Sequence, residues 1–133
     1  MPLTKKLVEK IIRENISDPN FCVKKLISIL NVSRSYLYDF VNENYGVGLQ
    51  RLIETYRLDK AIDLISDGVK FRGVCRECGY LRMRTFRGAF KKRLGISPSE
   101  FKRKLDDECE SKFEVVQRYK KILWGGVDVG LRK

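Results

Sequence analysis

Apolar residues recur along most of the chain at intervals of three and four, the spacing that places side chains on one face of an α-helix. Polar capping residues, glycines and prolines separate these stretches, so the pattern predicts about seven helices followed by a helical tail. The helices are expected at about 4–15, 23–30, 33–46, 49–66, 72–78, 82–94 and from 97 onwards. We therefore predict an all-α fold.

Several of the expected helix ends carry specific capping signals. Ser33 is suited to cap the start of the third helix, and Gly46 and Gly95 are suited to end the third and sixth helices. The run 97–100 contains a capping serine, a proline at the first helical position and a glutamate that can complete a capping box. The apolar stripe of the 49–66 helix is broad enough to pack on two sides, so this helix is expected to join two halves.

The chain contains an internal repeat, formed by residues 26–46 and 74–95. Each copy predicts a short apolar helix, a turn, and a longer amphipathic helix that ends at a glycine. Aligning the two glycines places Leu37 on Phe86, Phe40 on Ala89 and Val41 on Phe90, which are the inward positions of both longer helices. This is the helix-turn-helix pattern, in which the second helix lies in the major groove of DNA. One chain could therefore contact two successive major-groove faces, roughly 34 Å apart, without a dimer partner.

These elements suggest four parts: a first helix-turn-helix subdomain (1–47), a linking helix (48–67), a second helix-turn-helix subdomain (68–105) and a C-terminal tail (106–133). In the tail, Phe113, Val116, Tyr119 and Ile122 recur at three-residue spacing. We expect this stripe to dock a short helix on the domain, with a frayed terminus after it. Binding of a partner by the stripe is the alternative.

The charge of the chain points to a polyanionic partner. The 28 Lys and Arg residues outnumber the 17 Asp and Glu residues, and the net charge is +11. Such a surplus favours DNA, RNA or an anionic membrane surface, while 43% hydrophobic residues argue against a disordered chain. Residues 70–104 contain twelve Lys or Arg and only two acidic residues. This excess of basic residues could simply form a solvated surface. It coincides with the second copy of the repeat, however, and this favours nucleic-acid binding.

The protein is not expected to span a membrane or to be secreted. No stretch has the apolar length needed to span a bilayer, and the N-terminus lacks an apolar signal core. We expect the protein to stay in the cytoplasm, where its four cysteines would be reduced.

Residues 79–103 resemble the C-terminal signature of AraC/XylS-type transcription regulators. The matching positions are Gly79, Tyr80, Phe86, Phe90, Lys91, Gly95, Ser97, Pro98 and Phe101. Residues 31–41 are similar to the family's Gly-Val-Ser-x-x-x-Leu pattern, and the resemblance covers about residues 4–104. It implies sequence-specific binding to double-stranded promoter DNA, more often for activation, and contact with RNA polymerase. The chain has no room for a separate effector domain, so it looks most like the compact, monomeric MarA group, unless it was cut from a longer protein.

On the longer helix of the second unit, the outward positions are the candidates for DNA contacts. Arg84 is the best base-reading residue, because its guanidinium fork suits guanine O6 and N7, and Arg87 follows one turn later. Arg82 and the run Lys91–Arg93 are expected to contact phosphates. Met83 and Gly88 also face outward, and Gly88 stands where the family usually carries a longer polar side chain.

On the longer helix of the first unit, Ser35 and Asn42 can form hydrogen bonds, and Tyr38 can pack on a sugar or a thymine methyl group. Asp39 departs from the family: it would be repelled by phosphates unless it accepts from cytosine N4, and an intramolecular pair with an arginine is the alternative. The first unit is therefore expected to act mainly on the DNA backbone. The complete set of candidate DNA-binding residues is Arg34, Ser35, Tyr38, Asn42, Arg82, Arg84, Arg87, Lys91 and Lys92.

The remaining cysteine and tyrosine residues are expected to pack in the core or in turns, and not to bind metal or take part in a reaction. Cys75 and Cys78 form a lone C-x-x-C, but structural zinc needs four ligands, and the family places core residues there, so no metal or cofactor is expected. The tyrosines at 36, 45, 56 and 80 are expected in the core or in turns. The competing functions are a non-specific or architectural nucleic-acid-binding protein and a DNA-repair enzyme. An enzyme is not expected, because a reactive thiolate needs activation and the chain has no His.

Overall fold

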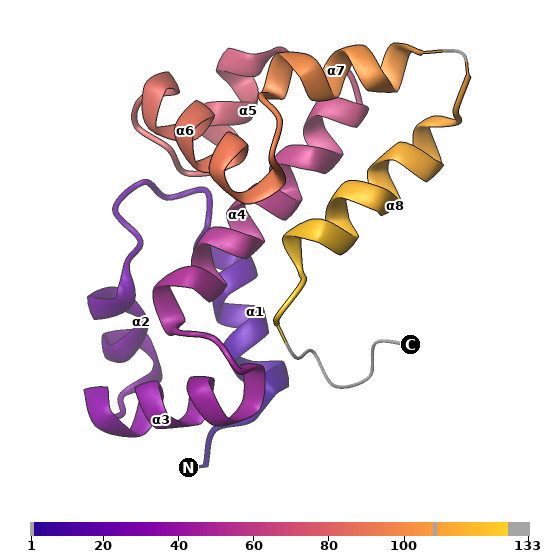
Figure 1. Ribbon diagram of the computed structural model, residues 1–133. Coiled ribbons are helices and arrows are strands. Elements are labelled where there is room, and N and C mark those ends of the chain that lie inside the picture. The colour runs from indigo at the N-terminus through magenta and orange to yellow at the C-terminus, as the bar shows by residue number, and fades with distance from the viewer. Residues whose placement is uncertain (1, 108, 128–133) are drawn as a thin grey trace.

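The structure, a computed structural model, describes residues 2–107 and 109–127. In these ranges the chain forms eight α-helices and no strand, so the all-α prediction is confirmed (Figure 1). The helices are α1 (Lys5–Asn15), α2 (Val23–Leu30), α3 (Arg34–Tyr45), α4 (Leu49–Ser66), α5 (Phe71–Glu77), α6 (Met83–Leu94), α7 (Pro98–Asp106) and α8 (Lys112–Leu123). None of the helices described is both long and apolar enough to cross a membrane.

The capping residues determine where the helices begin and end. The Ser33 hydroxyl accepts the Tyr36 amide at 3.1 Å, and Ser97 forms a complete capping box with Glu100. Both longer helices of the repeat end at a left-handed glycine, with φ of 72° in one and 83° in the other. The predicted bounds agree with the structure to within one residue at these ends.

The apolar side chains form two separate clusters, and α4 contributes to both. The first cluster joins α1, α2 and α3 to Leu49, Leu52, Ile53 and Tyr56 of α4. The second cluster joins α5, α6, α7 and α8 to Leu58, Ala61, Ile62 and Ile65 of α4. As the breadth of its stripe predicts, α4 is therefore packed on two sides and links two helical halves.

The tail forms helix α8, which docks on the domain as predicted, but only two of the four residues of the predicted stripe, Val116 and Tyr119, are buried. Phe113 is 72% exposed and Ile122 is 49% exposed. An α-helix has about 3.6 residues per turn, so these two positions, nine residues apart, lie on opposite sides of α8. The helix docks through Val116 and Tyr119 together with Val115 and Leu123, which are all buried. The segment directly after the helix is not frayed as predicted, since Val127 is buried and Trp124 packs against both clusters; residues 128–133 lie outside the described residues.

A second connection between the halves is made by the segment between α1 and α2. The guanidinium of Arg57, on α4, donates to the carbonyls of Ile16, Asp18 and Phe21 at 3.1–3.3 Å. These hydrogen bonds hold the Ile16 carbonyl against Gly79, in the turn between α5 and α6. Gly79 has φ of +82°, and a Cβ there would lie 2.0 Å from the Ile16 oxygen. Only glycine fits this position.

Gly79→Ala is expected to destabilise the protein by more than the ordinary cost of a left-handed alanine. The left-handed backbone costs about 1–2 kcal/mol, and displacement of the Ile16 carbonyl adds to it. Gly95→Ala is the matched control, since Gly95 has φ of +83° and an added methyl group there would meet only open space. Chemical denaturation measures both losses of unfolding free energy. Equal losses would contradict the close contact between the halves.

Candidate nucleic-acid interface

The longer helices of the two units, α3 and α6, have the same arrangement of buried and exposed positions. Leu37 and Val41 of α3 are fully buried, as are the aligned Phe86 and Phe90 of α6. The third aligned pair, Phe40 and Ala89, is half-buried and packs against the two clusters, so all three pairs face inward as predicted. A second stripe, at i, i+3, i+4 and i+7, runs along the other side of each helix. It consists of Ser35, Tyr38, Asp39 and Asn42 on α3 and of the aligned Arg84, Arg87, Gly88 and Lys91 on α6.

The stripe on α6 is strongly basic. Its arginine and lysine side chains are all exposed, and so is the neighbouring Lys92. Gly88 lies in the middle of the stripe, and nothing lies within 4 Å of the position that a Cβ would occupy. The stripe thus presents three cations around a position where the helix backbone itself is accessible.

The stripe on α3 carries one charge, the carboxylate of Asp39, and Arg34 lies beside this stripe. The Arg34 guanidinium donates to the Tyr38 hydroxyl at 3.3 Å and lies over its ring, 5.7 Å from the centroid. Ser35 and Asn42 are exposed, and Tyr38 is half-buried. Asp39 is exposed and forms no ion pair with an arginine within the part of the chain that the structure describes, so the intramolecular pair is not found. This stripe offers hydrogen-bonding groups more than charge.

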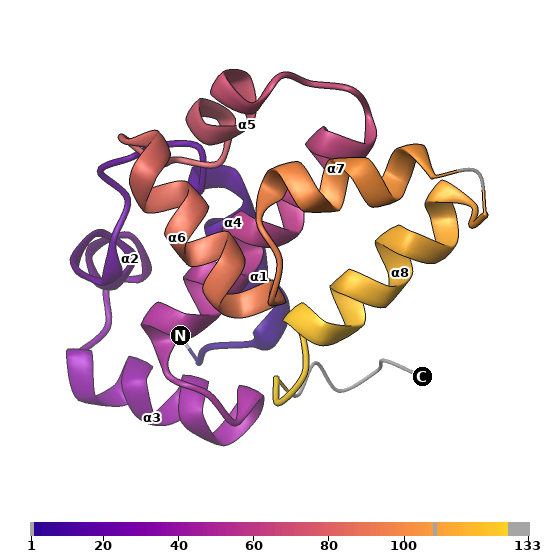
Figure 2. The same ribbon diagram turned by 45° about the horizontal axis from the view of Figure 1, so that its top comes forward.

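The two longer helices lie at successive positions along α4. In Figures 1 and 2, α3 lies below the start of α4 and α6 lies above α3, with α2 at the left and α8 at the right. The nine candidate DNA-binding residues all belong to α3, to α6 or to the cap of α6. None of the nine is buried. The fold therefore leaves them accessible on equivalent parts of the two repeat units.

Arg93 was expected to contact phosphate, and this prediction is wrong. Its side chain is only 8% exposed and forms an ion pair with Glu54 of α4 at 2.7 Å. Its second terminal nitrogen donates to the Thr55 hydroxyl at 2.9 Å and to the Leu123 carbonyl at 3.0 Å. The reason is its register, since position 93 lies seven residues after Phe86 and three after Phe90, on the core side of α6. Arg93 therefore joins α6 to α4 and α8.

The start of α6 differs from the start of α3. Arg82 is the N-cap residue of α6 and forms no side-chain capping hydrogen bond, whereas Ser33 caps α3. Met83, expected to face outward, is half-buried and packs against the second cluster. Leu81, in the turn before α6, is 77% exposed, and no periodic signal in the sequence indicated this. Tyr36, expected in the core or a turn, is also exposed.

The two cysteines of the C-x-x-C motif are buried in the second cluster. Burial raises the pKa of both thiols, that of Cys78 to about 12, so neither is a ready thiolate at neutral pH. Within the described residues, no three or more His, Cys, Asp or Glu side chains are placed to hold a metal ion. The packing interpretation of the motif accords with this placement.

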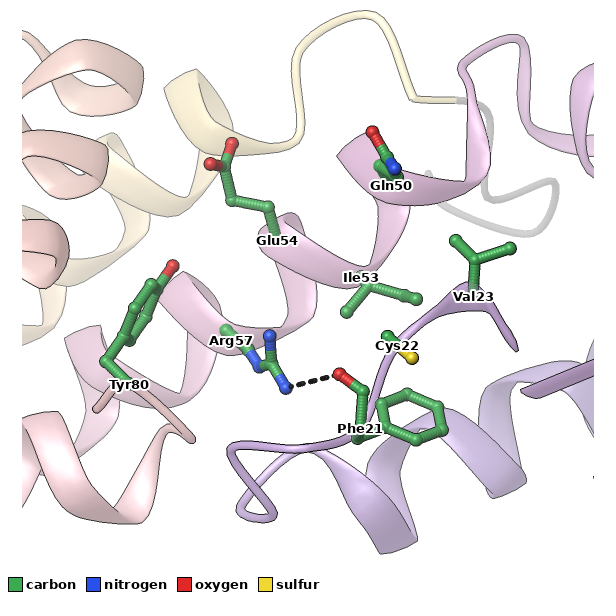
Figure 3. A pocket seen from close by; sticks show the side chains of 8 residues that line it. All are labelled: Phe21, Cys22, Val23, Gln50, Ile53, Glu54, Arg57 and Tyr80. Atoms are coloured by element: carbon green, nitrogen blue, oxygen red, sulfur yellow. Dashed lines mark hydrogen bonds between the residues drawn. The ribbon is translucent and has the colours of Figure 1, made fainter. Parts of the chain in front are cut away.

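A crevice of about 220 Å³ lies between the two units, shown in Figure 3. Its walls come from the segment before α2, from α4 and from the turn before α6. The lining residues are Phe21, Cys22, Val23, Gln50, Ile53, Glu54, Arg57 and Tyr80. Its volume is below the roughly 300–1,000 Å³ of typical small-molecule sites. Arg57, which crosses it, donates to the Phe21 carbonyl at 3.2 Å, so the crevice marks the contact between the units.

Comparison with known sequences gives a clear family match. Residues 26–104 match the family described as "Helix-turn-helix domain". The chain is 30% identical over 100 residues to the raffinose operon transcriptional regulatory protein RafR of Pediococcus pentosaceus, covering 74% of this chain and 36% of that protein. The chain spans about a third of the length of the curated relatives that it matches.

Two solved structures share the arrangement of helices. The C-terminal domain of the two-component response regulator yesN from Fusobacterium nucleatum has a TM-score of 0.69 at 27% identity, covering 74% of this chain and 96% of that one. The DNA-binding domain of AdpA, solved in complex with a target DNA, has a TM-score of 0.69 at 22% identity, covering 75% and 90%. Because the family match includes both repeat units and more than half of the residues, the chain belongs to the AraC/XylS-type family of helix-turn-helix DNA-binding domains found in transcription regulators.

Proposed function

We propose that the chain is a sequence-specific regulator of transcription that places α3 and α6, as recognition helices, in successive major-groove segments of promoter DNA. It acts in the cytoplasm as a monomer on its site, as an activator, and contacts RNA polymerase. The α6 helix reads bases through Arg84 and Arg87, while α3 acts mainly on the DNA backbone.

The observation that carries this proposal is the equivalence of the two exposed stripes. Each lies on the longer helix of a helix-turn-helix unit, opposite a buried side, and each helix ends at a left-handed glycine. Such a helix enters a major groove with the residues near its N-terminus facing the bases. The AdpA domain, which was solved with its target DNA, has the same fold and so supports this mode of binding.

The basic residues of α6 and its cap have two different roles, base recognition and phosphate binding. Arg84, in the first turn of α6, has the fork that can bind guanine O6 and N7 together. Arg82, Lys91 and Lys92 are exposed at either end of the helix, where phosphates flank a groove. Arg84 would discriminate between sequences, and the three flanking cations would increase affinity for any duplex.

We test this division with Arg84→Ala and Lys92→Ala on a duplex selected from random DNA. For the unchanged protein, about seven phosphate contacts would lower the affinity by about four decades between 50 and 200 mM salt. Arg84→Ala should cost about 1–3 kcal/mol on the selected site and relax the preference at one base pair. Lys92→Ala should weaken binding to all sequences alike and reduce the salt slope by about one.

Both side chains are exposed, so each variant should fold like the original and serve as a control for the other. Identical effects of the two substitutions on selected and random DNA would contradict the division of roles. Equal affinity of the unchanged protein for selected and random DNA would favour a non-specific or architectural protein. A nearly flat salt plot on duplex DNA would contradict nucleic-acid binding altogether.

Gly88→Ala tests whether the backbone of α6 approaches the groove closely. Alanine is more favourable than glycine inside a helix, and the new methyl group meets no protein atom, so the free protein should gain roughly 0.5–1 kcal/mol of stability. If the glycine permits close approach, binding to the selected site should weaken despite this gain. Thermal unfolding and titration of DNA measure the two effects. A stabilised variant with the original affinity and specificity would show that the position makes no contact.

A further inference from the structure

The C-terminal segment, residues 112–127, contacts both helix-turn-helix units although it lies beyond the family match, which ends at residue 104. In Figure 1 it returns from the outer end of α7 along α4 towards the first unit. It consists of α8 and the turn that follows it. Its contacts therefore extend beyond the second unit, on which α8 itself docks.

The α8 helix is fixed to the second unit by apolar and charged contacts. Its four buried side chains belong to the second cluster, and the ring of Tyr119 packs edge-on against Phe101 of α7, with 5.4 Å between the centroids. Lys120 forms ion pairs with Asp63 at 2.8 Å and with Asp59 at 3.6 Å, both on α4. This part of the segment therefore moves with the second unit.

The turn after α8 is fixed to the first unit. Val127 is buried in the first cluster, and Trp124 packs against both clusters. The indole lies edge-on to Tyr56 at 5.0 Å between centroids, and its N–H donates to Asp59 at 2.9 Å. Trp124 therefore occupies the point at which the two units, α4 and the C-terminal segment meet.

The ends of both recognition helices meet this same turn. Near the end of α6, Arg93 donates to the Leu123 carbonyl at 3.0 Å. At the end of α3, a Cβ on Gly46 would lie 3.7 Å from the Gly126 carbonyl oxygen. Leu123 thus contacts the C-terminal end of α6, and Gly126 lies close to the glycine that ends α3.

We propose that the C-terminal segment fixes the orientation of α6 relative to α3, with Trp124 as the positioning residue, and so restricts the chain to DNA sites with one separation of half-sites. This inference rests on the proposed function, in which both helices bind DNA, and on α3 adding some base contacts to those of α6. On the opposite side of α4, the units touch through the Ile16–Gly79 contact. Contacts on two sides of the linking helix prevent the bending that contacts on one side would permit.

The test on DNA compares Trp124→Ala with Phe113→Ala. Phe113 is an aromatic residue of the same segment but is 72% exposed, so its removal leaves the contacts of the segment intact. The probes are the selected site and two versions with one base pair inserted or removed between the half-sites. The original protein and Phe113→Ala should lose at least about tenfold in affinity on the altered sites, because the base contacts that α3 adds to those of α6 then fall out of register. Trp124→Ala should lose less than about tenfold, and Trp124→Phe, which keeps the ring contact, should restore the preference.

A second measurement uses the full chain without DNA. Spin labels are attached at Glu43→Cys on α3 and Thr85→Cys on α6, both exposed positions, with the exposed Cys22 and Cys109 replaced by serine. Pulsed electron resonance then gives the distribution of distances between the labels. We expect one narrow distribution for the original protein and for Phe113→Ala, and a clearly broader one for Trp124→Ala.

The outcomes distinguish the two proposals. A folded Trp124→Ala with the original spacing preference and label distances overturns the role of the segment, as does an original protein that tolerates altered spacing. If Trp124→Ala does not fold, Val127→Ala takes its place, since it removes only two methyl groups from the first cluster. The spacing preference and the label distances are then measured for that variant, and the same results decide. If the original protein prefers no DNA sequence, the proposed function fails, and the label distances in the free protein still decide whether the segment holds the helices.

Discussion

The two halves of the molecule are held together because α4 must bury different sides against two different cores. Its first half packs against α1–α3 and its second half against α5–α8. Burial of each large apolar side chain contributes about 1.5–3 kcal/mol, so neither half can move away from α4 without a large loss of stability. A single rigid helix thereby sets the distance between the two recognition helices, and the contacts around it set their orientation.

Local chemistry explains why much of this arrangement could be predicted from the sequence. Ser33 and Ser97 start their helices through hydrogen bonds to nearby amides, and Gly46 and Gly95 end theirs because they adopt a left-handed backbone. These signals act within a few residues, so they are visible without knowledge of the tertiary fold. The aligned glycines also determined the register of α3 and α6, and hence which residues of each helix are exposed.

Long-range contacts explain what could not be predicted. Arg93 lies in a run of basic residues, and only its register relative to Phe86 and Phe90 could have indicated that it is buried beside Glu54. The start of α8 could have been found, because Ser111 and Glu114 have capping-box spacing and form that box. The role of Trp124 could not, since its partners Tyr56 and Asp59 lie more than sixty residues earlier in the chain.

If one chain holds two recognition helices at a fixed separation, both helices must protect DNA within a single binding site. Hydroxyl-radical footprinting of the selected site, with the stoichiometry of the complex measured by native mass spectrometry, detects this. We expect two protected segments on one side of the duplex, with centres about 10 base pairs apart, and one protein chain on each duplex. A single protected segment, or a complex that forms only with two chains, would contradict the model of two readers in one chain.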